Sequence, residues 1–188
     1  MRLICRISVV FLSLAALAIP ATQTNHPYRT KYVKDTFGRS AALGTGAGAG
    51  ISQARNVPHE WGGGVAGFGK RVGSGFGEHV IKNTIAFPIA SIRHEELGYQ
   101  RSGKTGFGPR LKYALVSTVI THKTTTGKQT PAVGRMSGAF GSGLISRAWM
   151  PARLHTVGSG VASGGIMLGA DAGMHVAREF WPQHKQSR

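Results

Sequence analysis

Residues 61–87, WGGGVAGFGKRVGSGFGEHVIKNTIAF, decide the fold. Apolar side chains recur here every three or four positions, as on one face of an α-helix, at Val65, Phe68, Val72, Phe76 and Val80. A second stripe, spaced by four, is formed by Gly69, Gly73 and Gly77. Glycine in a helix interior costs about 1 kcal/mol relative to alanine, so such a stripe is useful where a second backbone comes close. We therefore expect a long helix whose glycines contact neighbouring helices.

The four-residue spacing of small residues returns in three further segments. They are residues 35–55 with Gly44, Gly46, Gly48 and Gly50, residues 132–149 with Gly134, Gly138 and Ser142, and residues 156–181 with Gly165, Gly169 and Gly173, preceded by the pair Gly160 and Gly164. We expect a close-packed helix in each segment, with Asp35 as the N-cap of the first. A flexible Gly/Ala linker is the alternative for that first segment. The central helix is expected over about residues 60–96, where Pro88 should kink it or divide it in two.

Residues 111–133 leave the choice between helix and strand open. The run LKYALVSTVIT (111–121) is apolar and β-branched, which suits a short helix or a strand. TTTGKQT (124–130) has the composition of a turn, so strands on both sides would make a hairpin. The sequence thus predicts a mostly α fold of about four to five close-packed glycine-zipper helices, with one short β-hairpin as an option. We assign residues 35–182 to this single glycine-rich helical domain.

The first 21 residues have the pattern of a Sec-type signal peptide. Arg2 and Arg6 supply the positive start, residues 7–19 supply the apolar core, and cleavage is expected after Ala18 or Ala21. An uncleaved anchor is the alternative, although the apolar run is short for a membrane span. Residues 22–34 are interpreted as a polar linker and residues 183–188 as a polar tail. The one cysteine, Cys5, lies in the signal peptide, so the exported chain would contain neither a disulfide nor a thiol nucleophile.

The chain is strongly basic. It has 23 Lys and Arg residues against 7 Asp and Glu residues, a formal net charge of +16. Removal of the signal peptide would leave a net charge of about +14. Such a charge attracts anionic partners, among them phospholipid headgroups, acidic polysaccharides and nucleic acid. Export and the lack of an RNP-like or helix-turn-helix signature disfavour nucleic acid.

Residues 98–105 (GYQRSGKT) match the phosphate-binding pattern G-x4-G-K-[ST]. In nucleotide-binding proteins this loop follows a buried strand and opens a helix. Here the charged run RHEE precedes it closely and GFGP follows it. We interpret the match as chance. The basic loop is still a candidate for a general anion site, with Arg101, Lys104 and Arg110 as its cationic residues.

A second polar feature lies in the last glycine-rich segment. Asp171 and His175 are four residues apart and would share a helix face, with Arg178 one turn further along. We favour a buried polar network between packed helices over metal binding or catalysis. The histidines show no metal-ligand spacing, and neither a G-x-S-x-G elbow nor a carboxylate pair is evident. We therefore expect no catalytic residue, metal or other cofactor.

Four runs of the sequence carry a resemblance: QARNVPHEWG (53–62), GFGKR (67–71), PRLKYAL (109–115) and RLHTV (153–157). In these runs the chain resembles a group of exported glycine-rich bacterial proteins to which no activity is attached. The resemblance extends over most of the exported chain. It implies export and a shared fold.

These features favour a non-enzymatic cell-envelope protein that associates with a membrane through its glycine-zipper helices and basic faces. The alternative is a soluble periplasmic binder of an anionic ligand, namely a lipid headgroup, a polysaccharide or nucleic acid. An enzyme built around Asp171 and His175 is the third option. The expected partner is a membrane or an anionic envelope component, and a second copy of the chain is the alternative partner.

Overall fold

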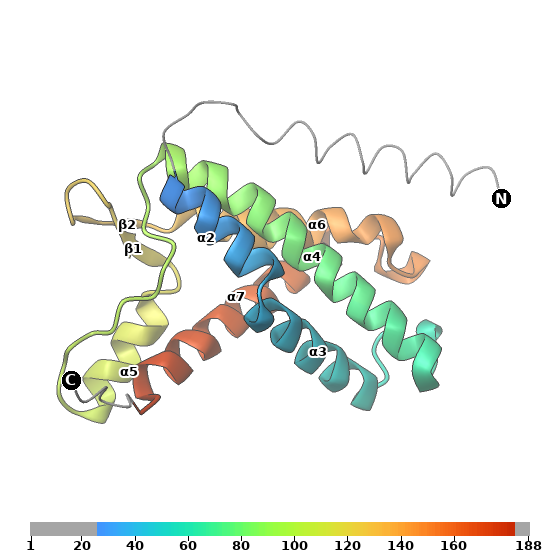
Figure 1. Cartoon of the computed structure of the whole chain (residues 1–188). Helices are drawn as coiled ribbons and strands as arrows, with labels where there is room; N and C mark the ends of the chain where they lie inside the picture. The colour runs from blue at the N-terminus through green and yellow to red at the C-terminus, as the bar shows by residue number, and fades with distance from the viewer. Residues whose placement is uncertain (1–25, 183–188) are drawn as a thin grey trace.

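The computed structural model describes residues 26–182. The predicted signal peptide (1–21), the first part of the predicted linker and the polar tail (183–188) lie outside the described residues. Within them the chain is mostly helical, with one two-stranded antiparallel sheet (Figure 1). The predicted fold class is therefore confirmed, including the optional hairpin.

The elements follow one another with short connections. They are α2 (His26–Phe37), α3 (Arg39–Ala54), α4 (Gly64–Ile92), α5 (Phe107–Val116), β1 (Ile120–His122), β2 (Gln129–Pro131), α6 (Val133–Ile145) and α7 (Val157–Phe180). In the hairpin Thr121 is paired with Thr130. The run at 111–121 thus divides between the end of α5 and the start of β1, which is why its composition fitted both a helix and a strand.

Helix α6 lies between α4 and α7 and contacts both of them extensively. Helices α2 and α3 pack against α4, and α5 packs against α7. Figure 1 shows α2 alongside the C-terminal half of α4, and α5 beside the C-terminal end of α7. Four of the helices, α3, α4, α6 and α7, correspond to the four glycine-rich segments of the sequence.

The prediction of a polar linker at residues 22–34 is wrong for residues 26–34, which belong to α2. Tyr28, Tyr32 and Thr36 recur every four residues and attach α2 to the end of α4. The Tyr32 ring packs edge-on against Phe87 at a centroid distance of 5.3 Å. The Thr36 hydroxyl accepts a hydrogen bond from Asn83. Polar-tipped side chains form this helix face, so it has no apolar periodicity.

Two predicted helix boundaries are also wrong. Asp35 is not an N-cap, because it lies inside α2 and pairs with Lys31 one turn earlier. The N-cap of α3 is Gly38, which makes no side-chain capping bond. Pro88 does not divide α4, which continues to Ile92. Helix α6 packs against this part of α4, where Gly134 approaches Ala86 and Ala90.

The closest helix contacts are made by glycines of α6 and α7. A Cβ atom on Gly138 would lie 2.5 Å from the Lys82 carbonyl oxygen, and one on Gly134 would lie 2.8 Å from the Ala86 carbonyl oxygen. Both distances are shorter than any tolerated Cβ contact, so α6 reaches α4 at this distance only with glycine. Gly143 of α6 meets the backbone of Gly160 and Gly164 of α7 in the same way.

The predicted contact stripes on α4 and α7 are wrong. A Cβ atom on Gly69, Gly73, Gly165, Gly169 or Gly173 would meet nothing within 4 Å, and one on Gly77 would make only an ordinary contact with Trp149. In α7 the buried glycines are Gly160 and Gly164. Since Gly164 and Gly165 are adjacent, they point about 100° apart around the helix. Gly160 with Gly164, and Gly165 with Gly169 and Gly173, both have a four-residue spacing. The sequence pattern does not show which of the two sets faces a neighbouring helix.

Polar side chains fill much of the interior, and large apolar side chains lie on the outside. Among the described residues, 26–182, seven of the eight buried apolar residues are alanines, and Phe87 is the eighth. The largest fully buried side chains are Glu95, Glu179, Thr36, Ser142 and Ser146. By contrast, twenty large apolar side chains are exposed, among them Leu43, Val65 and Ile166. The fully buried apolar core is therefore small, and part of the apolar surface faces outward.

Candidate functional site

The carboxylate of Glu179 is the centre of the densest polar cluster. Glu179 lies near the C-terminal end of α7 and is only 1% exposed. Its Oε1 accepts hydrogen bonds from the Ser102 hydroxyl at 2.6 Å and Arg110 Nε at 2.9 Å. Its Oε2 accepts hydrogen bonds from the Tyr99 hydroxyl at 2.7 Å and the Ser102 backbone N–H at 3.1 Å. Arg110 also donates to the backbone carbonyl of Glu179.

Two glycines give the chain the turns that this cluster needs. Gly103 has a φ of +63° and Gly106 a φ of +86°, in the left-handed region that favours glycine. Gly103 follows Ser102 directly, and Gly106 directly precedes α5. The connection therefore turns around the Glu179 carboxylate before the helix begins. We call Glu179 with Tyr99, Ser102 and Arg110 the Glu179 site.

The Glu179 site is built for a charged carboxylate. Burial alone would raise the pKa of the Glu179 carboxyl, but the hydrogen bonds from Ser102, Tyr99 and Arg110 outweigh burial and lower this pKa to about 2. Burial and the neighbouring carboxylate raise the pKa of the Tyr99 hydroxyl, so Tyr99 remains a hydrogen-bond donor. The site is therefore an internal anion-binding site that the chain fills with its own side chain.

This finding changes the interpretation of residues 98–105. The loop connects α4 to α5, two helices, and does not follow a strand. Ser102 and Tyr99, within the motif, bind the Glu179 carboxylate. Of the predicted anion-site residues Arg101, Lys104 and Arg110, the last is paired with Glu179 through its guanidinium. Arg101 donates to the Trp181 carbonyl, and Lys104 lies over the Tyr113 ring at 5.5 Å from its centroid.

The predicted network of Asp171, His175 and Arg178 divides into separate contacts. Asp171 pairs with Lys82 of α4, whose Nζ lies 2.6 Å from both carboxylate oxygens. His175 is buried, stacks on the Tyr99 ring and lies 3.2 Å from the Ser117 hydroxyl. Arg178 is wrongly included, because it lies on the exposed side of α7. The next residue, Glu179, is buried and would have been the better choice.

Burial and the positive charge of Arg135 lower the pKa of His175 to about 4, while Asp171 opposes this change. The imidazole is therefore neutral near pH 7. The neutral His175 ring stacks on Tyr99, and its Nδ1 lies within hydrogen-bonding distance of the Ser117 and Thr118 hydroxyls. Within residues 26–182, no three His, Cys, Asp or Glu side chains come together as a metal site would require.

Several buried charged side chains were missed by sequence reasoning. Arg71 is 3% exposed and donates five hydrogen bonds to neutral oxygens of residues 53–62. Glu95 accepts from the Gly134 backbone N–H at 2.9 Å, which caps the start of α6. Arg135 donates to the carbonyl oxygens of Ser117 and Thr118. A charge within an apolar or glycine-rich run was the available signal for Arg71 and Arg135.

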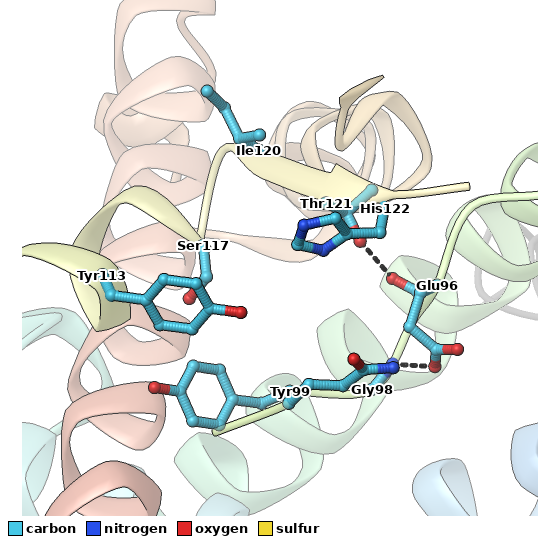
Figure 2. A pocket seen from close by; sticks show the side chains of 9 residues that line it. Glu96, Gly98, Tyr99, Tyr113, Ser117, Ile120, Thr121 and His122 are labelled. Atoms are coloured by element: carbon cyan, nitrogen blue, oxygen red, sulfur yellow. Dashed lines mark hydrogen bonds between the residues drawn. The ribbon is translucent and has the colours of Figure 1, made fainter. Parts of the chain in front are cut away.

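A small cavity lies beside the Glu179 site, between the 95–100 connection, α5 and β1 (Figure 2). Figure 2 shows the Tyr99 and Tyr113 rings one above the other, with Glu96 and His122 across the cavity. Thr121 donates to the Glu96 carbonyl at 2.6 Å, and the Gly98 N–H donates to the Glu96 carboxylate. The cavity volume is about 10 Å³, which is room for about one water molecule. An organic substrate does not fit there.

Almost all of the acidic side chains form ion pairs within the protein. Six of the seven form an ion pair: Asp35, Glu60, Glu78, Glu95, Asp171 and Glu179. The seventh, Glu96, accepts a hydrogen bond from Gly98. Most basic residues within 26–182 therefore form no ion pair with a carboxylate of this chain.

Comparison of the chain with protein-family models, with curated proteins and with solved structures found no match. Across the described helices, none combines the length and the apolar character that crossing a bilayer requires.

Proposed function

We propose that this is a non-enzymatic, exported cell-envelope protein that associates with a membrane surface through exposed apolar side chains and an excess of cations. One observation carries the proposal: the fully buried interior is polar and alanine-rich, while many large apolar side chains are exposed. Exposed apolar area of this extent is typical of an interaction surface.

Helix α7 illustrates the exposed apolar surface. Every exposed residue from Val157 to Ala177 is small or apolar, and none is charged. The exposed residues of α3 from Ala42 to Ala54 have the same character. On the first half of α4, Val65, Phe68 and Phe76 are exposed beside the open glycines Gly69 and Gly73. These faces are the candidates for contact with a bilayer.

Charge supports the same partner. The sequence has no acidic residue between Glu96 and Asp171, and the carboxylates outside this range are nearly all paired. Each Lys or Arg near an anionic bilayer contributes about 1 kcal/mol of attraction. Apolar and electrostatic attraction together bind a protein to a membrane surface.

The alternative, a soluble periplasmic binder of an anionic ligand, has less support. Arg110 is committed to Glu179, and the cavity beside that site holds about one water molecule. An enzyme around Asp171 and His175 has less support still, since Lys82 binds Asp171 while His175 is enclosed by packing.

Vesicle flotation tests the proposed function. The exported chain is purified, and its N-terminus is sequenced, because a retained signal peptide would itself bind lipid. We expect it to float with vesicles of phosphatidylglycerol and phosphatidylcholine, and to bind at least tenfold less tightly to pure phosphatidylcholine. Raising the salt concentration should weaken the binding, because salt screens surface charge.

A chain that stays unbound on both vesicle types at low salt would contradict the proposal. If it then elutes as a discrete oligomer, the apolar faces belong to contacts between copies of the chain.

A further inference from the structure

We propose that the protein meets an anionic bilayer with one end, where α5 starts and α7 finishes. This inference rests on the proposed function and selects one surface for it. We call this end the α5–α7 tip, and its residues are Arg101, Lys104, Phe107, Arg110, Phe180 and Trp181. It lies at the lower left in Figure 1, where α5 and the end of α7 are side by side.

Aromatic side chains form the outer part of the tip. Phe107 is 69% exposed and Trp181 is 70% exposed. The Phe107 ring packs on the Phe180 ring at a centroid distance of 5.1 Å. Two large rings held this far into solvent are costly in water. Tryptophan and phenylalanine at the edge of a basic surface are typical of side chains that enter the interface of a bilayer.

Cations surround these rings. Arg101 donates to the Trp181 carbonyl at 2.8 Å, and the Arg110 guanidinium lies over the Phe180 ring at 4.5 Å. Lys104 is exposed and lies over the Tyr113 ring. The charge of Arg110 is compensated by Glu179, so Arg101 and Lys104 are the cations beside the aromatic rings that remain for headgroup phosphates.

The Glu179 site removes the negative charge that would oppose this contact. Glu179 is the only acidic residue after Asp171, and its carboxylate is buried beneath the tip. The four hydrogen bonds to this carboxylate also hold the loop with Arg101 against the end of α7. The tip is therefore a rigid cationic and aromatic surface.

Charge complementarity selects an anionic bilayer as the partner. The sequence that follows Trp181 adds Lys185 and Arg188 and no acid. An acidic protein would satisfy the cations, but it would leave Phe107 and Trp181 facing polar side chains. A bilayer satisfies both, with phosphates for the cations and acyl chains for the rings.

Two pairs of variants test the tip. Phe107→Ser with Trp181→Ser removes the rings, and Arg101→Gln with Lys104→Gln removes two cations. We expect the first pair to weaken binding to phosphatidylglycerol vesicles at least tenfold, and the second pair to weaken it about tenfold. The matched controls are Val33→Ser with Ile92→Ser, and Lys70→Gln with Lys128→Gln, all exposed, away from the tip and outside the apolar faces of α3, α7 and the first half of α4. We expect each control to stay within twofold of the wild type.

A direct measurement uses the fluorescence of Trp181. In a protein with Trp61→Phe and Trp149→Phe, Trp181 is the single tryptophan. Vesicles with brominated acyl chains should quench it and shift its emission to the blue. This measurement decides the question if the serine variants fail to fold, which their melting curves will show.

The outcomes separate this inference from the proposed function. A wild-type chain that binds no vesicles overturns both. A chain that binds while Trp181 stays unquenched, or while the tip variants bind as tightly as the wild type, overturns the tip alone. In that case Ile51→Ser with Val65→Ser tests the exposed apolar faces of α3 and α4, and a loss of binding there would assign the contact to them.

Discussion

Gly164 and Gly165 are neighbours in α7 with different surroundings. A Cβ atom on Gly164 would lie 2.5 Å from a Phe140 ring carbon and 2.9 Å from the Phe140 Cα. A Cβ atom on Gly165 would meet nothing within 4 Å. Gly164 is required for the packing of α7 on α6, whereas Gly165 makes no such contact and only lowers the helix propensity of α7.

Gly164→Ala and Gly165→Ala should therefore change stability in opposite directions. We expect Gly164→Ala to destabilise the fold by about 1–3 kcal/mol, because the backbone of α6 cannot move away cheaply. We expect Gly165→Ala to stabilise it by up to about 1 kcal/mol through helix propensity. Thermal and urea unfolding of both variants measure this difference. Equal changes in both variants would contradict the assignment of the contact face.

The sequence allowed prediction of helix-spaced glycines but not of the contact face of each helix. At Gly134 and Gly138 the expected packing residues do lie against α4, whereas on α7 the expected stripe is one residue away from the packed one. Periodicity fixes spacing along a helix, but the rotation of a helix depends on its neighbours. No signal in the sequence distinguishes Gly164 from Gly165.

At the level of elements, the Glu179 site joins the α4–α5 connection and α5 to the end of α7. Burial would raise the pKa of Glu179, but its hydrogen bonds lower it from 4.5 to about 2. Because the folded pKa is below the unfolded one, the carboxylate stabilises the fold fully above about pH 4.5. This contribution is lost as the pH falls from there towards about 2.

Glu179→Gln removes that contribution. At pH 7 we expect a loss of about 2–3 kcal/mol of unfolding free energy, somewhat below the usual value for a broken buried pair, because Arg110 is partly exposed. The difference between wild type and variant should shrink as the pH falls from 4.5 to 2. Urea unfolding at several pH values measures it. A difference that stays constant over this range would contradict the ionised Glu179 site.

Helices were predictable from the sequence where apolar residues or glycines recur at helical spacing. They were less predictable where hydrogen bonds between polar side chains attach a helix to its neighbours. The helices around the glycine-rich segments were expected, and residues 26–34 were not, because tyrosines and a threonine attach α2. Pro88 indicated a kink or a division of the helix, but α4 continues through it to Ile92, where it packs against α6. The Glu179 site joins residues that are about 70–80 positions apart, which local patterns do not reveal.

Across the whole molecule, paired acids, unpaired cations and exposed apolar side chains occur together. The net charge was predictable from composition, and the pairing of nearly all acids was not, since it depends on tertiary contacts. The exposed apolar faces were also unexpected, because an apolar stripe on a helix is usually buried. This combination is the basis of the proposed association with a membrane.

Fractionation of cells that produce the chain, with sequencing of its N-terminus, tests membrane association most directly. We predict that the chain begins after Ala18 or Ala21 and sediments with membranes at physiological salt concentration. A chain with that N-terminus that remains in the soluble periplasmic fraction as a monomer would contradict the proposed function.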